Sequence, residues 1–138
     1  MQKNKLAICY GNDLIGNDAL GKAVYEILPP EVNKIFSIQL LPELLEKAME
    51  FDEIVFVDAA YGDSSPSLTE IFAREDGNAD FHSLSAEGFL KLLEVLYSKT
   101  PKAYMCVAYF QNFEIGKLDD DFWQKRDDTA KIALDILQ

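Results

Sequence analysis

The stretch LAICYGNDLIGNDALG, residues 6–21, joins an apolar run to a glycine-containing loop and then to the start of a helical pattern. Leu6 to Tyr10 is continuously apolar, which is typical of a strand buried on both faces of a sheet. From Ala19, apolar residues recur at helical spacing until Pro29 and Pro30 end the helix. A strand, a loop and a helix in this order predict the first unit of an α/β fold.

The rest of the chain repeats this alternation of strand and helix. Strands are expected at residues 34–40, 53–58, 68–73 and 103–110, and helices at residues 42–49, 85–98 and 119–137. We therefore expect a single domain, residues 1–138, folded as a three-layer α/β/α sandwich. Its mostly parallel twisted sheet should contain about five strands.

The composition argues against several classes of partner. Acids outnumber bases by 24 to 13, which gives a net charge of −11. This charge repels nucleic acid phosphates and anionic lipid, so we expect neither nucleic acid nor a membrane as a partner. The apolar runs are far shorter than the roughly 20 residues of a membrane span, and the first residues lack the apolar core of a signal peptide. A cytoplasmic location is the expectation that follows.

The two cysteines and the serines give little support for a covalent hydrolase. Cys9 and Cys106 both fall inside strand-like apolar runs, where a thiol usually packs as a small hydrophobic group. Neither lies in the exposed, electropositive setting that favours a thiolate. The segment at residues 62–66 lacks the final glycine of a nucleophile elbow. We expect both cysteines to be buried and structural.

The loop after the first strand occupies a position where many α/β proteins bind phosphate. Gly11 and Gly16 have the spacing of a phosphate-binding loop, but Asn17 and Asp18 stand where Lys and Ser or Thr would meet the phosphates and magnesium. An acid there repels phosphate, and the dinucleotide pattern G-x-G-x-x-G is absent. Taken alone, Asp18 is typical of a helix cap.

Two further residues give Asp18 a second interpretation. Asp58 ends the apolar run of a neighbouring strand, and His82, which is the only histidine, precedes the helix expected from Ser85. Two carboxylates and one imidazole form a mixed ligand set that suits zinc, nickel or iron and leaves positions open for substrate or water. The structural alternatives are an Asp58 that caps a turn and a His82 that is a satisfied polar group.

In combination, these segments resemble the hydrogenase maturation proteases, the endopeptidases that trim the large-subunit precursor of nickel-iron hydrogenases. The likeness covers nearly the whole chain. The segments that carry it are, in chain order, Gly11 to Gly21, Val57-Asp58-Ala59, Phe81-His82-Ser83-Leu84-Ser85 and Phe113-Glu114-Ile115-Gly116. The resemblance implies that Asp18, Asp58 and His82 form both the metal-contacting and the catalytic site.

The resemblance also implies a reaction and a partner. The protein would be a nickel-dependent endopeptidase of aspartic or metallo type that removes the C-terminal extension of the hydrogenase large-subunit precursor after nickel insertion. The nickel would be carried by the precursor, so that the protease itself is isolated without metal, and zinc or cadmium can substitute in the isolated protein. The alternative is a non-catalytic chaperone that binds metal or precursor on the same scaffold, and a flavodoxin-like nucleotide-binding protein is a more distant third.

The sequence departs from the pattern of this family at two places. Asn17 replaces the first acid of the usual pair, which changes the local charge but leaves the mapped ligand Asp18. Ser64-Ser65-Pro66-Ser67 replaces a loop in which glycines more often surround the proline. Both departures bear on the choice of hydrogenase more than on the activity.

Overall fold

The computed structural model describes residues 4–76 and 84–138. Its strands are β1 (Lys5–Tyr10), β2 (Asn33–Ser37), β3 (Glu53–Tyr61), β4 (Ser67–Ile71) and β5 (Lys102–Phe110). Its helices are α1 (Leu20–Ile27), α2 (Leu45–Ala48), α3 (Ala86–Tyr97) and α4 (Phe122–Leu137), and the 3₁₀ turns η1 (Gly16–Ala19) and η2 (Pro42–Leu44) precede α1 and α2. The five strands form one sheet in the order β2-β1-β3-β5-β4, in which only the β4–β5 pair is antiparallel. The expected α/β sandwich with a mostly parallel sheet is confirmed.

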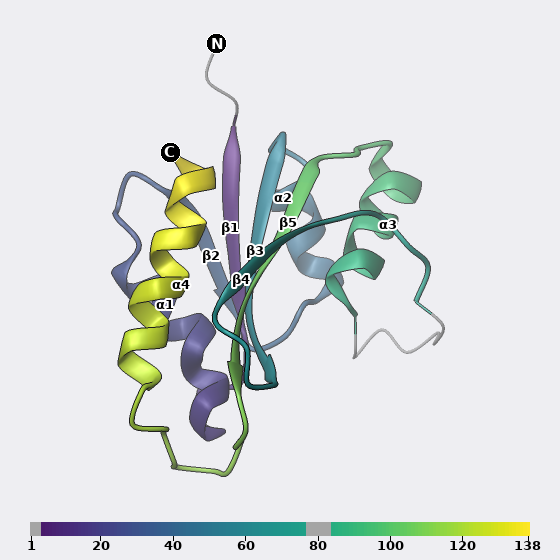
Figure 1. Ribbon diagram of the computed structural model, residues 1–138. Coiled ribbons are helices and arrows are strands. Elements are labelled where there is room, and N and C mark those ends of the chain that lie inside the picture. The colour runs from purple at the N-terminus through teal and green to yellow at the C-terminus, as the bar shows by residue number, and fades with distance from the viewer. Residues whose placement is uncertain (1–3, 77–83) are drawn as a thin grey trace.

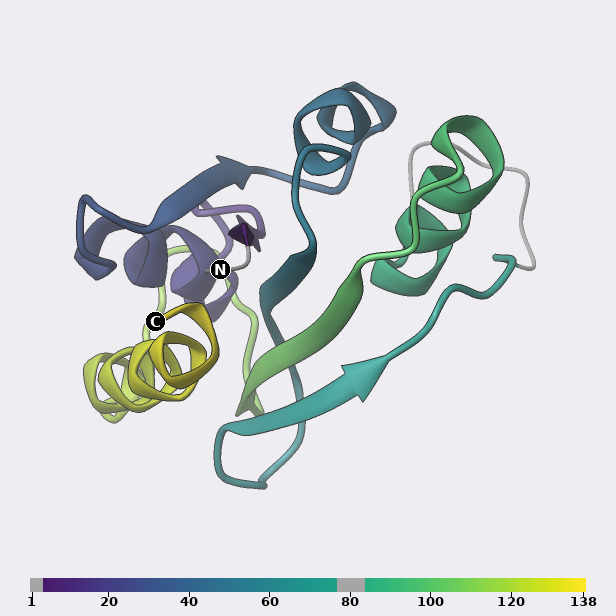
Figure 2. The ribbon, with the colours of Figure 1, turned by 90° about the horizontal axis from the view of Figure 1, so that it is seen from above.

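The helices cover both faces of the sheet, as Figures 1 and 2 show. Helices α1 and α4 pack on one face, against Ala7 and Val57 among others, and α2 and α3 pack on the other, against Ile8 and Phe56. The two sets alternate along β1 and β3 because successive side chains of a strand point to opposite faces. The longest helix, α4, has 16 residues. Within the described parts of the chain, no helix has the length and apolarity needed to cross a membrane.

The observed elements differ from the expected ones mainly at their ends. Strand β3 continues past Asp58 to Tyr61, because β5 provides it with a pairing partner as far as Phe110. Strand β2 is shorter than expected, and the helix expected at residues 42–49 consists of η2 followed by the short α2. Helix α4 begins at Phe122, so the three aspartates at 119–121 precede its first turn.

The order of the strands creates a topological switch point between β1 and β3. The chain leaves β1 toward β2 on one side and returns with β3 on the other side of β1. In open parallel sheets, ligands bind at such a switch point, beyond the carboxyl ends of the strands. The register pairs Cys9 with Val57, so Tyr10 and Asp58 are neighbours at the end of β1. By the alternation of side chains, both belong to the face that α2 and α3 cover.

The two cysteines are structural, as expected. Cys9 lies in β1 and Cys106 lies in β5, and both are free and fully buried. Burial raises the pKa of each thiol to about 12, so neither is a thiolate at neutral pH.

Candidate functional site

The loop between β1 and α1 folds back so that Asp18 lies over the end of β1. Gly11 has φ +141°, and a Cβ at this position would lie 2.4 Å from the Asp18 carbonyl oxygen and 3.2 Å from its Oδ1. Only glycine permits this approach. The Asn12 backbone N–H donates to Asp18 Oδ2 at 2.6 Å, which fixes the carboxylate above the strand.

Asp18 therefore does not cap the helix that follows it. The N-cap of α1 is Ala19, and neither α1 nor η1 has a side-chain cap hydrogen bond. The interpretation of Asp18 as a helix cap is wrong, because its carboxylate turns back to the loop instead. Burial raises the pKa of Asp18, and the hydrogen bond from Asn12 partly offsets this rise.

Asp58 is the second carboxylate at the switch point between β1 and β3. Burial raises its pKa to about 7, and the hydrogen bond that its Oδ1 accepts from the Ala59 N–H at 2.8 Å acts in the opposite direction. The charge of Asp18 raises the pKa of Asp58 further, which places the two carboxylates close enough to repel each other. Asp58 lies within β3, so the alternative that it caps a turn is wrong.

Tyr10 is a member of this site that the sequence reasoning missed. Its hydroxyl hydrogen-bonds with Asp58, which lowers the pKa of that carboxyl, and it also contacts Met105 Sδ at 3.9 Å. Burial and then the charge of Asp58 raise the pKa of Tyr10 well above its usual range. In the sequence, Tyr10 is the last residue of an apolar run, which is typical of a core residue. The only sign that it belongs to the site is its position directly before the glycine-containing loop.

The start of α3 lies near the same group of side chains. The charge of Glu87, in the first turn of α3, contributes to the raised pKa of Tyr10. Ser85 is the N-cap: its hydroxyl accepts from Gly88 N and donates to the Asp76 carboxylate, which also accepts from Ser85 N at 3.1 Å. Asp76 and Ser85 bracket residues 77–83, so His82, the third expected site residue, lies outside the described residues.

The two carboxylates are suited to a divalent cation. Each uses one oxygen in a backbone hydrogen bond, and burial disfavours the ionised form of each. A cation between two such groups would relieve both their repulsion and their desolvation. Residues 4–76 and 84–138 contain no cluster of three or more His, Cys, Asp or Glu side chains with metal-binding geometry.

Asn17 ties this loop to another loop at the same end of the sheet. It is fully buried; its Nδ2 donates to Asn112 O at 2.6 Å and its Oδ1 accepts from Asp119 N at 3.0 Å. An ionised aspartate could accept the second of these bonds but could not donate the first. The departure at Asn17 is thus more than a change of charge, because the amide connects the β1–α1 loop to the β5–α4 loop.

Replacement of this amide should destabilise the fold. We expect Asn17→Ala to lower the free energy of unfolding by about 2–3 kcal/mol, because it removes a fully buried side chain and leaves the partly buried Asn112 carbonyl and Asp119 N–H without this partner. Asn17→Asp should cost less at low pH, where the carboxyl is protonated and can donate, than at pH 8. Urea denaturation of both variants measures the difference, and an Asn17→Ala variant as stable as the parent would contradict it.

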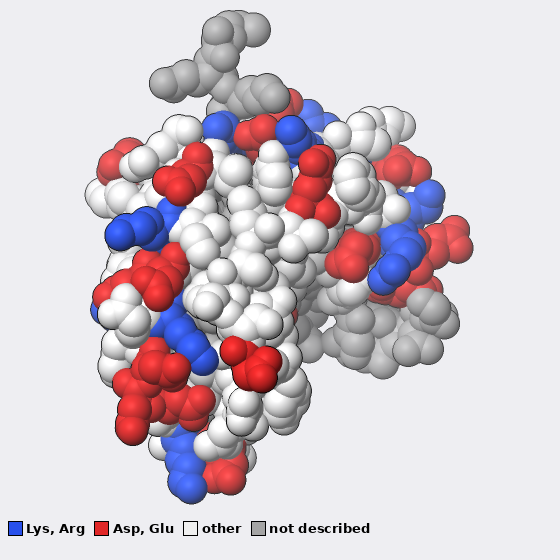
Figure 3. All heavy atoms as spheres, in the orientation of Figure 1, with Lys and Arg blue, Asp and Glu red and all other residues white. Residues whose placement is uncertain are grey.

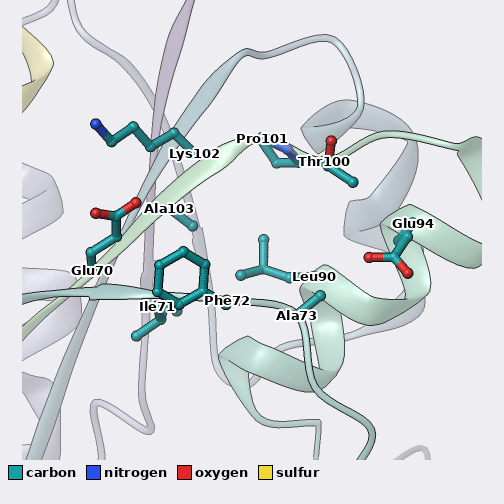
Figure 4. Close-up of a pocket in the computed structure, with 10 residues that line it drawn as sticks. All are labelled: Glu70, Ile71, Phe72, Ala73, Leu90, Glu94, Thr100, Pro101, Lys102 and Ala103. Atoms are coloured by element: carbon teal, nitrogen blue, oxygen red, sulfur yellow. The ribbon is translucent and has the colours of Figure 1, made fainter.

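A separate cavity lies at the opposite end of the sheet. It has a volume of about 430 Å³ and forms where the chain beyond β4 diverges from the start of β5 (Figure 4). Its lining residues are Glu70, Ile71, Phe72, Ala73, Leu90, Glu94, Thr100, Pro101, Lys102 and Ala103. Asp18, Asp58 and Tyr10 are not among them, so this cavity is separate from the candidate site.

Comparison with solved structures shows that the chain has the fold of the hydrogenase maturation endopeptidases. The maturating endopeptidase HybD of E. coli matches it with a TM-score of 0.76 at 19% identity, over 97% of this chain and 91% of that one. HybD of Thermococcus kodakarensis matches with a TM-score of 0.75 at 19% identity, over 98% and 99% of the two chains. HycI of Thermococcus kodakarensis matches with a TM-score of 0.73 at 20% identity, over 98% and 92%. No protein-family model matches the sequence, and comparison with curated protein sequences gives no significant match.

Proposed function

We propose that this protein is an endopeptidase that removes the C-terminal extension of a nickel-iron hydrogenase large-subunit precursor, in the cytoplasm, after nickel insertion. The main support is the location of Asp18 and Asp58 at the switch point of a sheet with the maturation endopeptidase fold, where the charge of Asp18 raises the pKa of Asp58. The resemblance at residues 11–21, 57–59, 81–85 and 113–116 points to the same activity.

In this proposal, the nickel of the precursor is part of the substrate. Asp18, Asp58 and His82 would engage it and so place the scissile peptide, with a water, beside the carboxylates. A metal ion in that position would polarise the peptide carbonyl or lower the pKa of the water. The raised pKa of Asp58 leaves its carboxyl partly protonated near neutral pH, which suits a group that exchanges protons during hydrolysis.

The proposal is tested by single replacements assayed on a nickel-loaded precursor. Asp18→Asn, Asp58→Asn and His82→Ala should each slow processing at least about a hundredfold, because each removes one contact to the metal or the reacting water. Asp52→Asn is a matched control, because this acid precedes β3 at the opposite end of the sheet and pairs there with Lys99 at 3.2 Å. The amount of mature large subunit formed over time is the readout.

The outcomes separate a protease from a binding protein. Normal processing of the precursor by all three variants would contradict the proposed roles of these residues. Precursor binding without cleavage, even with nickel present, would instead favour the non-catalytic chaperone. Processing that requires no nickel in the precursor would contradict the assignment of nickel as part of the substrate.

A further inference from the structure

Large apolar side chains are exposed around the end of the sheet that holds Asp18 and Asp58. The set comprises Leu14, which is 74% exposed, Tyr61 at 73%, Ile115 at 81% and Leu118 at 44%, and we call these residues the apolar rim. They lie on the β1–α1 loop, at the end of β3 and on the β5–α4 loop. Figure 1 shows the connections after β3 and β5 together at the end of the sheet opposite the N-terminus.

The loops that carry the apolar rim are joined to one another. A Cβ at Gly16 would lie 2.2 Å from Glu114 O and 2.4 Å from Lys117 O, so the β1–α1 loop packs directly on the backbone of the β5–α4 loop. The ring of Tyr61 contacts the ring of Phe113, with centroids 4.6 Å apart. The apolar rim is therefore a preformed surface, which a partner could cover without ordering these loops first.

The same loops concentrate negative charge. Residues 11–19, 61–66 and 111–121 contain seven acids and one basic residue, Lys117. The acids are Asp13, Asp18, Asp63, Glu114, Asp119, Asp120 and Asp121. Three of these acids form ion pairs with lysines: Asp13 with Lys22, Glu114 with Lys117 and Asp121 with Lys125. At the lower end of the molecule, Figure 3 shows acidic and basic side chains next to white surface. Like charges facing each other oppose association, so this surface is poorly suited to a second copy of the chain.

We propose that the apolar rim is the docking surface for the precursor, and that it receives a segment in which lysine or arginine residues flank large apolar side chains. The inference rests on the proposed function for the identity of the partner. Apolar residues of the segment would cover Leu14, Tyr61 and Ile115, and its basic residues would face the acids between them. Leu14 belongs to the loop that holds Asp18, so a segment seated there would contact this loop.

The test compares charge insertions on the apolar rim with charge insertions elsewhere. Leu14→Glu and Ile115→Glu should each raise the Kd for the nickel-loaded precursor, and the KM for its processing, at least tenfold, while kcat changes less than threefold. Val95→Glu and Leu96→Glu are matched controls, because these side chains of α3 are 64% and 61% exposed and lie outside the rim. Their Kd and KM should stay within twofold of the parent values.

The charge of the partner segment is tested by ionic strength and by charge reversal. Precursor affinity should fall as salt rises from 50 to 500 mM, since the screening length of exposed charges shortens from about 14 Å to about 4 Å. Asp120→Lys should weaken binding further at low salt and make it less sensitive to salt. Thermal unfolding of every variant establishes that it is folded before its binding is compared.

Each outcome bears on one proposal only. Rim variants that bind and process the precursor as the α3 controls do would overturn the docking surface and leave the protease assignment intact. A parent protein that binds the precursor through the rim but never cleaves it would support the surface and overturn the activity. Sedimentation that shows a dimer which Leu14→Glu dissociates would assign the rim to self-association and overturn the inference.

Discussion

Asp58→Asn is expected to raise the free energy of unfolding at pH 8 by about 2–4 kcal/mol. Burial raises the pKa of Asp58 from 3.8 to about 7. Ionisation of this carboxyl at pH 8 therefore costs more free energy in the folded protein than in the unfolded chain. Each unit of difference between the folded and unfolded pKa corresponds to about 1.4 kcal/mol. Asparagine is neutral and nearly isosteric, and its Oδ1 can still accept from the Ala59 N–H.

The dependence of this gain on pH follows from the direction of the shift. Between pH 4 and pH 7 the unfolded chain has lost the Asp58 proton while the folded protein still holds it. The parent protein therefore loses stability from this group as the pH rises through that window, and the loss levels off above about pH 7. Asp58→Asn lacks this loss. The difference in free energy of unfolding between the variant and the parent should therefore be small at pH 4 and reach its full value at pH 8.

Urea denaturation at pH 4, 6 and 8 measures this advantage. Asp13→Asn serves as the control, because Asp13 gains a partner in Lys22 and its removal should not stabilise the protein. A gain from Asp58→Asn that is equal at all three pH values would show that burial of the charge is not its cause. Combined with loss of processing, a gain at pH 8 would mean that Asp58 is kept at a cost in stability, as is common for active-site residues.

Gly16→Ala is expected to lower the free energy of unfolding by about 3–4 kcal/mol. Gly16 has φ +48°, in the left-handed region that costs other residues about 1–2 kcal/mol. The added Cβ would also lie 2.2 Å from Glu114 O and 2.4 Å from Lys117 O, which are backbone atoms that cannot rotate away. The β1–α1 and β5–α4 loops would have to separate, and the hydrogen bonds of Asn17 would be strained.

Gly116→Ala is the matched control for this substitution. Gly116 also has a positive φ, +74°, but a Cβ there would meet no atom within 4 Å. Gly116→Ala should therefore lower the free energy of unfolding only by the cost of the left-handed backbone conformation, about 1–2 kcal/mol. Chemical denaturation of both variants gives the two values. Equal losses would show that the contact between the loops contributes nothing and would weaken the case for a preformed apolar rim.

Most of the fold could be predicted because its elements carry local patterns. The buried strand at Leu6 to Tyr10, the amphipathic α3 and the apolar β5 each show their periodicity within about a dozen residues. The extension of β3 to Tyr61 could not be predicted in this way. It depends on pairing with β5, as in the register of Ala59 with Ala108, and pairing between strands distant in sequence leaves no local signal.

The candidate site was predictable in part, for the same reason. Asp18 and Asp58 follow or end apolar runs, and in a parallel sheet such positions meet at one edge, so their proximity could be expected from sequence. The hydrogen bond of Tyr10 to Asp58 could not, because it depends on the register of β1 with β3. The role of Asn17 also escaped prediction, since its two partners are 95 and 102 residues away.

The sequence by itself determined that this chain is an α/β protein with acids at the carboxyl ends of its central strands. Periodicity and composition act within one element, and the hydrophobic effect translates them directly into buried strands and covering helices. Only the tertiary structure decided that the Asp18 carboxylate turns away from its helix and that burial raises the pKa of Asp58 to about 7. It also decided that three segments distant in sequence together form the apolar rim. These features arise from contacts between segments distant in sequence, where desolvation and backbone packing depend on how the whole chain is folded.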